Sequence, residues 1–164
     1  MTEDRTNFTI RFATEEDVPT VLRFIRDLAI YERLEHLVVA TEEIIRDTVF
    51  GARRYAEVLI GEIDGDPAGF ALFFHNFSTF LGRPGIYLED LFVRPEFRGK
   101  GYGKALLARL AELAIERNCG RVEWAVLDWN TPSIEFYKSI GAVPMDDWRI
   151  FRLRGEALEK LAKG

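Results

Sequence analysis

The hexapeptide Arg98-Gly99-Lys100-Gly101-Tyr102-Gly103 lies between a predicted strand and a predicted helix, and its chemistry decides how the chain is interpreted. Glycines let a backbone approach a ligand closely, and the free N–H groups at a helix start attract phosphate. Together with Arg94 and Lys104, the segment gathers four positive charges within eleven residues of a chain whose net charge is −5. This local reversal of charge predicts a site for an anionic ligand. A tight turn with solvated charges is the alternative.

The glycine spacing separates this segment from two common phosphate loops. No Gly-Lys-Ser/Thr sequence closes it, so it is not a P-loop. Gly99, Gly101 and Gly103 stand at every second position, which differs from the G-x-G-x-x-G pattern of dinucleotide-binding folds.

The elements on either side of the hexapeptide predict a mixed sheet flanked by helices. Alternating or apolar runs predict strands over 8–12, 56–63, 68–77, 86–93, 121–127 and 147–153. Helices are expected after a capping box at 14–17, after Thr41, after the glycine-rich turn, from Asn130-Thr131-Pro132 to Gly141, and over 155–163. Asp64-Gly65 is a strong hairpin signal between two of the strands. The fold class is therefore α/β or α+β, in a single domain.

Composition excludes several classes of protein. An acidic chain is a poor general binder of nucleic acid, whose binding domains are basic. The single cysteine, Cys119, excludes an internal disulfide or a thiolate cluster, and two histidines make a histidine-rich metal site improbable. The polar start Met1–Asn7 does not resemble a signal peptide, and no apolar run reaches the ~18 residues of a membrane span. We expect a cytoplasmic protein without metal.

Three blocks of sequence resemble one enzyme superfamily. Arg98-x-x-Gly101-x-Gly103 resembles the pyrophosphate loop of the GNAT acetyl-CoA-dependent N-acetyltransferases. The preceding segment 87–93 (YLEDLFV) and the later segment 128–138 (DWNTPSIEFYK) are similar to the branch that holds the diamine (spermidine/spermine) and thialysine N-acetyltransferases. The resemblance runs from about residue 10 to residue 153. It implies a single N-acetyltransferase domain over 1–164, with its core at about 8–153 and a short tail helix at 155–163. Its sheet would be mixed, mostly antiparallel, and splayed between two central strands.

The resemblance also implies which residues hold acetyl-CoA. Backbone groups of a bulged strand at Leu91, Phe92 and Val93 would pair with the pantetheine arm. The loop that would cradle the pyrophosphate consists of Arg98, Gly99, Lys100, Gly101, Tyr102, Gly103 and Lys104. Asn130 and Ser133 would support the cofactor at the start of the next helix, where Asn130 is also a good N-cap residue.

Catalysis of acetyl transfer to an amine needs a base and an acid. Glu89 is the candidate general base, directly or through water, and a strand-edge carboxylate in an ion pair is its alternative role. Tyr137 matches the family tyrosine that protonates the leaving thiolate, although Phe136-Tyr137 could instead be aromatic core. A backbone N–H of Leu91 or Phe92 is the expected oxyanion donor.

The expected acceptor is a small cationic amine: a diamine, a polyamine, or thialysine or another lysine-like compound. By resemblance its site is lined by Tyr31, Glu32, Glu89, Asp90, Asp128, Trp129 and Trp148, which offer carboxylates and cation–π faces. The chain departs from the polyamine enzymes in the shorter segment 143–147 and the tighter turn at Asp64-Gly65, so compact amines stand beside polyamines as expected acceptors.

Two other functions are compatible with the same residues. One is a protein lysine or N-terminal acetyltransferase of the same fold, and the other is a non-catalytic acyl-CoA-binding module. The branch also implies a homodimer, for which Phe73, Phe74, Phe77 and Phe80 could form a face; they could equally be core.

Overall fold

The structure is a computed structural model that describes residues 7–164, so the expectation about the chain start lies outside it except at Asn7. The chain forms two compact units, one ending at Ala125 and the other comprising Val126–Gly164. Each is described by itself.

The first unit is built on a five-stranded sheet with the spatial order β1-β2-β3-β4-β5. The strands are β1 (Phe8–Phe12), β2 (Glu57–Ile63), β3 (Asp66–Ser78), β4 (Arg83–Val93) and β5 (Val122–Trp124). The first four pair antiparallel in sequence order, and β5 pairs parallel to β4. The predicted mixed, mostly antiparallel sheet is confirmed, although β5 is shorter than the expected strand 121–127.

A two-residue turn joins β2 to β3 and fixes their register. Asp64 and Gly65 both have positive φ, at 50° and 81°, and Ile63 pairs with Asp66. Positive φ at both central positions is the signature of a type I′ hairpin, whose twist matches that of the strands. The hairpin predicted at Asp64-Gly65 is confirmed.

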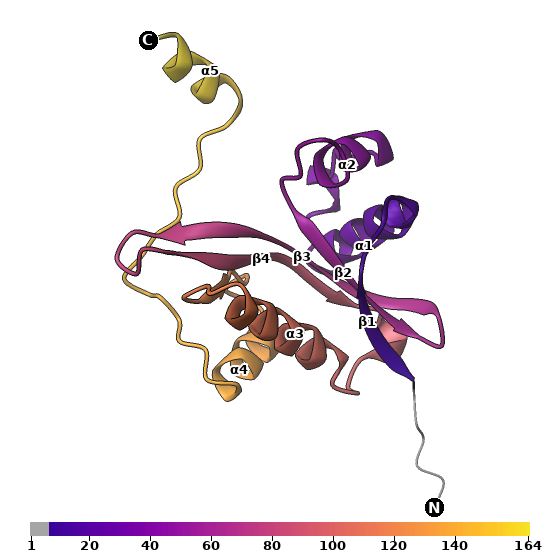
Figure 1. Cartoon of the computed structure of the whole chain (residues 1–164). Helices are drawn as coiled ribbons and strands as arrows, with labels where there is room; N and C mark the ends of the chain where they lie inside the picture. Colours follow the sequence, from indigo (N-terminus) through magenta and orange to yellow (C-terminus); the bar gives the residue numbers. More distant parts are fainter. Residues whose placement is uncertain (1–6) are drawn as a thin grey trace, which may run out of the picture. The chain divides into compact units, whose positions relative to one another are not determined.

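Helices cover both faces of this sheet (Figure 1). One face carries α1 (Val18–Tyr31) and α2 (Glu42–Val49), while α3 (Tyr102–Glu116) lies on the other. Three short 3-10 turns complete the unit, at Glu15–Asp17, Glu35–Leu37 and Pro95–Phe97.

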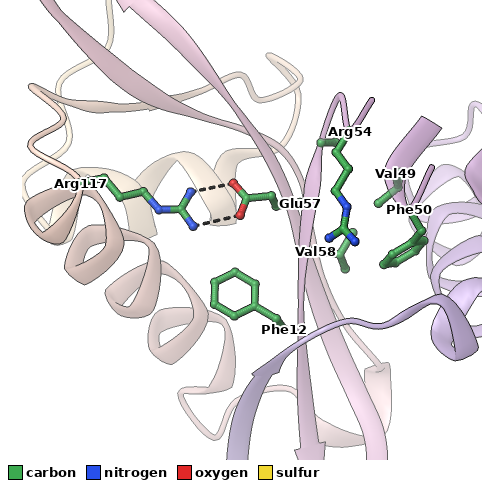
Figure 2. Close-up of a pocket in the computed structure, with 8 residues that line it drawn as sticks. Phe12, Val49, Phe50, Arg54, Glu57, Val58 and Arg117 are labelled. Atoms are coloured by element: carbon green, nitrogen blue, oxygen red, sulfur yellow. Dashed lines mark hydrogen bonds and ion pairs between the residues drawn. The ribbon is translucent and has the colours of Figure 1, made fainter. Parts of the chain in front are cut away.

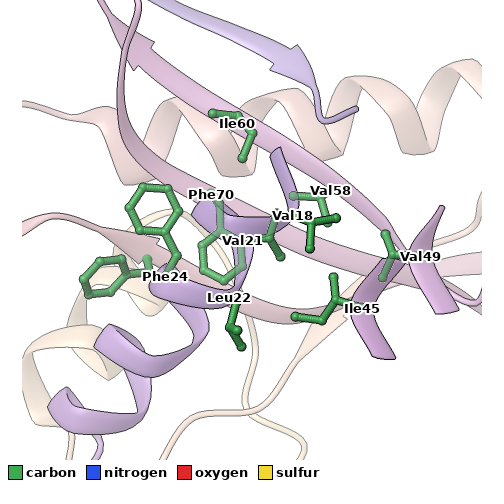
Figure 3. Packing of buried hydrophobic residues seen from close by; sticks show 10 residues of the cluster. Val18, Val21, Leu22, Phe24, Ile45, Val49, Val58, Ile60 and Phe70 are labelled. Atoms are coloured by element: carbon green, nitrogen blue, oxygen red, sulfur yellow. The ribbon is translucent and has the colours of Figure 1, made fainter. Parts of the chain in front are cut away.

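The core under α1 and α2 consists mainly of aliphatic side chains and includes the rings of three phenylalanines (Figure 3). The Phe24 ring lies 5.4 Å from that of Phe70 and 5.8 Å from that of Phe92, within the range of favourable ring pairs. Val18 and Val21 have no exposed surface. This packing fixes α1 against β3 and β4, and so fixes the position of the residues at its C-terminal end.

A bulge in β4 changes which side chains face α1. Phe73 pairs with Leu88 and Leu72 with Asp90, so Glu89 is an extra residue with no partner in β3. Side chains alternate along a strand, and cross-strand partners share a face. The extra residue therefore turns Asp90 toward the face that α1 covers. Without it, Asp90 would share the face of Leu88.

The second unit contains two helices, α4 (Thr131–Ser139) and α5 (Gly155–Lys163). Both were expected, and α5 has the expected bounds. The strand expected over 147–153 is wrong, because these residues form no strand pair and are exposed. Apolar and polar residues alternate here as they do in a strand, but a strand also needs a neighbouring strand with which it forms hydrogen bonds. The exposed side chains include Trp148 at 74%, Ile150 at 78% and Phe151 at 93%.

Candidate active site

An open sheet edge lies beside the second half of β4. Strand β5 pairs with Ile86, Tyr87 and Leu88 only, and β4 then continues to Val93 with no described strand on that side. This open edge begins at the bulge. The expected splay between two central strands stays a prediction, because β5 is the last strand of the described sheet.

The register shows which peptide groups of β4 face this open edge. The Arg94 N–H donates to the Ala68 carbonyl at 2.8 Å, next to the Gly69–Val93 pair. Hydrogen-bonded and non-hydrogen-bonded pairs alternate in an antiparallel ladder. The peptide groups of Leu91 and Val93 therefore point away from β3 and toward the open edge, whereas those of Phe92 point toward β3.

The glycine-rich turn leads from this edge into α3. Gly99 and Gly101 have φ of 77° and 84°, a left-handed conformation that glycine adopts without strain, and Gly101 is the N-cap of α3. Tyr102 is buried, and its ring stacks on Phe8 with centroids 4.3 Å apart. The turn is thereby anchored to β1, and the start of α3 presents the orphan N–H groups that suit a pyrophosphate.

The four basic residues around the turn have different environments. Arg94 is neutralised by Asp66 at 3.1 Å and Glu96 at 2.5 Å. The Arg98 Nε donates to the Val93 carbonyl at 2.8 Å. Lys100 and Lys104 are exposed, and neither forms an ion pair with any residue in the range 7–164. The charge available to an anion thus comes mainly from the two lysines.

Three carboxylates lie near one another where β4 meets the end of α1. Burial raises the pKa of Asp90 to about 7, with further contributions from the charges of Glu89 and Glu32. Burial also raises the pKa of Glu32, and Glu89 adds to the effect. None of the three forms an ion pair with a described residue, so the alternative of an ion-paired Glu89 does not hold. Glu89 itself is exposed on the bulge.

Sequence reasoning placed Asp90 in the substrate site but missed that it would titrate near neutral pH. Its environment depends on Glu32, which is 58 residues earlier in the chain. The bulge left a signal that could have been used: Ile86 and Leu88 are two residues apart, but two acidic residues follow at 89–90 and the apolar run 91–93 is then unbroken. This break in the period of two marks an extra residue.

The remaining expected site residues lie in the second unit. The Asn130 side chain is buried and accepts a hydrogen bond from the Ser133 N–H at 3.4 Å, which caps α4. Tyr137 is half-buried on the same helix, with its ring 5.7 Å from that of Phe136. The helix ends at Ser139 with Ile140 as its C-cap, and Gly141 follows with a φ of 92°. Asp128, Trp129 and Trp148 are exposed.

A separate pocket of about 320 Å³ lies at the other edge of the sheet (Figure 2). Arg117 forms two hydrogen bonds with the Glu57 carboxylate there, at 2.6 and 2.9 Å. The other lining residues come from β1, α2 and the start of β2, and none belongs to the expected site. Figure 2 labels Arg54 and Phe12 among the residues that line this pocket.

Residues 7–164 contain no group of three or more histidine, cysteine or acidic residues that could hold a metal ion. No described helix is both long and apolar enough to cross a membrane.

The chain is similar to known acetyltransferases over most of its length. Residues 22–142 match the acetyltransferase (GNAT) family model. The thialysine N-epsilon-acetyltransferase of Bos taurus is 40% identical over 93% of this chain and 96% of its own. The L-ornithine N5-acetyltransferase NATA1 of Arabidopsis thaliana is 35% identical over 94% of this chain and 87% of its own.

Solved structures agree with the sequence matches. An integron cassette protein from the mobile metagenome of V. cholerae superposes with a TM-score of 0.80 and 30% identity, covering 96% of this chain and 98% of the other. With a family model that spans well over half of the sequence and relatives this similar across nearly all of it, the chain belongs to the acetyltransferase (GNAT) family.

Proposed function

We propose that this protein transfers the acetyl group of acetyl-CoA, the co-substrate of the GNAT family, to a primary amine of a small cationic molecule. The carboxylates Glu32, Glu89 and Asp90 carry the proposal, because they lie near one another where the bulge of β4 meets the C-terminal end of α1, and no described cation neutralises them. A cationic acceptor relieves their mutual repulsion. Relatives named for thialysine and L-ornithine support a compact amine, and a relative named for spermidine/spermine keeps diamines and polyamines in the proposed class.

The open edge and the glycine-rich turn would hold acetyl-CoA. The outward peptide groups of Leu91 and Val93 are suited to pair with the amides of the pantetheine arm. The amides from Gly99 to Lys104, with Lys100 and Lys104, are suited to the pyrophosphate. Asn130 and Ser133 are proposed supports from α4. Phe92, expected from the sequence to contact the cofactor through its backbone, is left out of this proposal because its peptide groups point toward β3.

Glu89 would remove the first proton from the substrate ammonium, directly or through a water. A primary amine with a pKa near 10.4 is neutral in only ~1 part in 2,500 at pH 7, a penalty of roughly 4–5 kcal/mol that a positioned base reduces. The Glu89 carboxylate is exposed on the bulge and has no described cation to hold it. Asp90 lies next to it, with a pKa of about 7. The pair therefore offers both a binding charge and a proton acceptor.

Bond making and breaking then involve two further groups. The neutral amine nitrogen attacks the thioester carbonyl while the Leu91 N–H donates to the developing oxyanion. The C–S bond breaks, and the Tyr137 hydroxyl gives its proton to the departing thiolate. The second amine proton restores the Tyr137 hydroxyl, so an amide and free CoA result. Tyr31, Asp128, Trp129 and Trp148 are proposed to complete the acceptor site.

We also propose a cytoplasmic homodimer. The single cysteine is consistent with a reducing compartment. Of the proposed phenylalanine face, Phe73 is core, whereas Phe77 and Phe80 are 62% and 99% exposed. The second unit also has many large exposed apolar side chains, namely Val143, Met145, Trp148, Ile150, Phe151, Leu153, Leu158 and Leu161. Such surface is typical of an interface. Sedimentation equilibrium should give twice the chain mass; the single-chain mass at all concentrations would contradict the dimer.

The activity is tested by thiol release from acetyl-CoA with a panel of amines. The panel contains thialysine, lysine, ornithine, putrescine, spermidine and a lysine peptide, with acetyl-CoA alone as the control. We expect strong turnover of at least one compact amine. Turnover of the peptide alone would point to a protein acceptor. No turnover, with acetyl-CoA still bound in calorimetry, would support a binding module instead.

The acid role is tested by Tyr137→Phe, which removes only the hydroxyl. We expect kcat to fall by ~10²-fold or more, because the thiolate loses its proton donor. Acetyl-CoA binding measured by calorimetry should change little. A kcat equal to that of the unmodified enzyme would assign Tyr137 to the packing of α4 rather than to catalysis.

A further inference from the structure

Arg98 belongs to the glycine-rich turn, but its side chain is directed to two aromatic rings. The guanidinium carbon lies 5.2 Å from the Tyr31 ring centroid and 5.3 Å from that of Phe92. Both distances are within the range of a cation–π contact. The Nε donates to the Val93 carbonyl at 2.8 Å, one of the groups at the open edge. Arg98 thus connects the C-terminal end of β4 to the last residue of α1.

The contrast with Arg94 shows that this arrangement is particular to Arg98. Arg94 also lies over a ring, that of Phe97 at 5.1 Å, but it forms ion pairs with Asp66 and Glu96. No carboxylate among residues 7–164 forms an ion pair with Arg98. Its contacts are a backbone carbonyl and two rings. These contacts orient the side chain but do not neutralise its charge.

The contact between Arg98 and Tyr31 lies at the C-terminal end of α1, where it can influence the position of Glu32. Tyr31 is the last residue of the helix and Glu32 follows it. Arg33 has a positive φ of 62°, a conformation that residues other than glycine seldom adopt. Three hydrogen bonds close this turn, from the N–H groups of Glu32, Arg33 and Leu34 to carbonyls in the last turn of α1, at 2.8–3.0 Å. The position of Glu32 therefore depends on a short and conformationally unusual segment.

We propose that Arg98 is a positioning residue that holds Tyr31 against β4, keeps Glu32 beside Glu89 and Asp90, and thereby sets the affinity for the amine. This inference rests on the proposed function, since Tyr31 and Glu32 are placed at the acceptor site. It separates Arg98 from Lys100 and Lys104, whose charges are available to the pyrophosphate.

The placement itself is tested without any substrate, by hydrogen exchange. We expect Arg98→Gln to speed exchange of the Glu32, Arg33 and Leu34 amides by about 2–5-fold, the equivalent of about 0.5–1 kcal/mol for an exposed cation–π contact. Tyr31→Leu should give the same change from the other side of the contact. The Phe50 amide, which closes the end of α2 through Arg46, serves as the internal control. Unchanged exchange at all three amides in both variants would overturn the proposal.

The effect on the acceptor is tested by a double-mutant cycle at saturating acetyl-CoA. With Tyr31 intact, Arg98→Gln should raise the KM for the amine by about 2–5-fold. In a Tyr31→Leu background it should add nothing, whereas in a Tyr31→Phe background, which keeps the ring, its effect should persist. Arg109→Gln on α3, which removes a guanidinium paired with Glu112 and Glu116, is the matched control and should leave the amine KM unchanged.

Equal effects of Arg98→Gln in the Tyr31 and Tyr31→Leu backgrounds would overturn the positioning role. A rise confined to the acetyl-CoA KM would also overturn it and would assign Arg98 to the cofactor. An unmodified chain that acetylates no amine would refute the proposed function, and the exchange result would then decide on the Arg98–Tyr31 contact alone.

Discussion

Two aspartates in the first unit lie next to α1, and their pKa values are shifted in opposite directions. Asp17 is the N-cap residue of α1, and Asp90 lies on the face of β4 that α1 covers. Asp17 accepts two hydrogen bonds from the Arg11 guanidinium, at 2.7 and 2.8 Å, and a third from the Thr14 N–H. These bonds hold the pKa of Asp17 below its usual value. Asp90 has no such partner, and burial beside two like charges raises its pKa to about 7.

The difference teaches how to separate structural carboxylates from functional ones in this fold. Where the chain supplies a counter-ion, as Arg11 does for Asp17 and Arg117 for Glu57, the carboxylate stabilises the folded state. Where it supplies none, the fold maintains a repulsive cluster at a cost in stability. Such clusters are typical of sites that bind a cation from outside.

The largest expected effect concerns catalysis at the unpaired cluster. Glu89→Gln should lower kcat by ~10²-fold or more and flatten the acidic limb of the pH–rate profile, because the base is lost. Its free energy of unfolding should change by less than about 0.5 kcal/mol, since Glu89 is exposed and has no described ion-pair partner. An unaltered pH–rate profile would make Glu89 a bystander.

The paired aspartate should show a loss of stability. Asp17→Asn should lower the free energy of unfolding by about 2 kcal/mol in urea titrations at pH 7, because Arg11 loses a charged partner. The pKa of Asp17 is lowered by folding, so its contribution is present above about pH 4 and is lost as the pH falls through the folded-state pKa. Arg11 also pairs with Glu62, which limits the loss. Equal stability of the two proteins at pH 7 would contradict this comparison.

The unpaired aspartate should show the opposite and smaller change. Folding raises the pKa of Asp90, so its ionisation makes stability fall as the pH rises from about 4 to about 7. Asp90→Asn should remove this fall and raise the free energy of unfolding by roughly 1–2 kcal/mol at pH 8, after allowance for partial exposure. A loss of stability at pH 8 would show that the Asp90 carboxylate is paired after all.

Local sequence patterns predicted most of the sheet because the deciding features are local. The alternation at 8–12, the Asp64-Gly65 turn and the Thr41 cap each act over a few residues, and each is present in the structure. The strand expected at 147–153 failed because alternation specifies a strand's faces but not its partner. Local patterns could not predict the raised pKa of Asp90, because it depends on the packing of α1 against a bulged strand.

The sequence predicted which residues belong to the candidate site better than it predicted how their side chains are arranged. The carboxylates Glu32, Glu89 and Asp90 were all named from sequence, but their proximity follows from the bulge. Arg98 was assigned to the pyrophosphate loop, whereas its side chain lies on Tyr31 and Phe92. Spacing along the chain identifies which residues share a loop, and it does not give the direction of a long side chain.

The bulge at Glu89 has a consequence for how this sequence can change in evolution. Deleting one residue there would not remove a single side chain from the site. It would exchange the two faces of the strand from Asp90 to Val93, taking Phe92 away from Phe24 and placing an aspartate among the leucines under α3. We therefore expect this strand to diverge by substitution at fixed length.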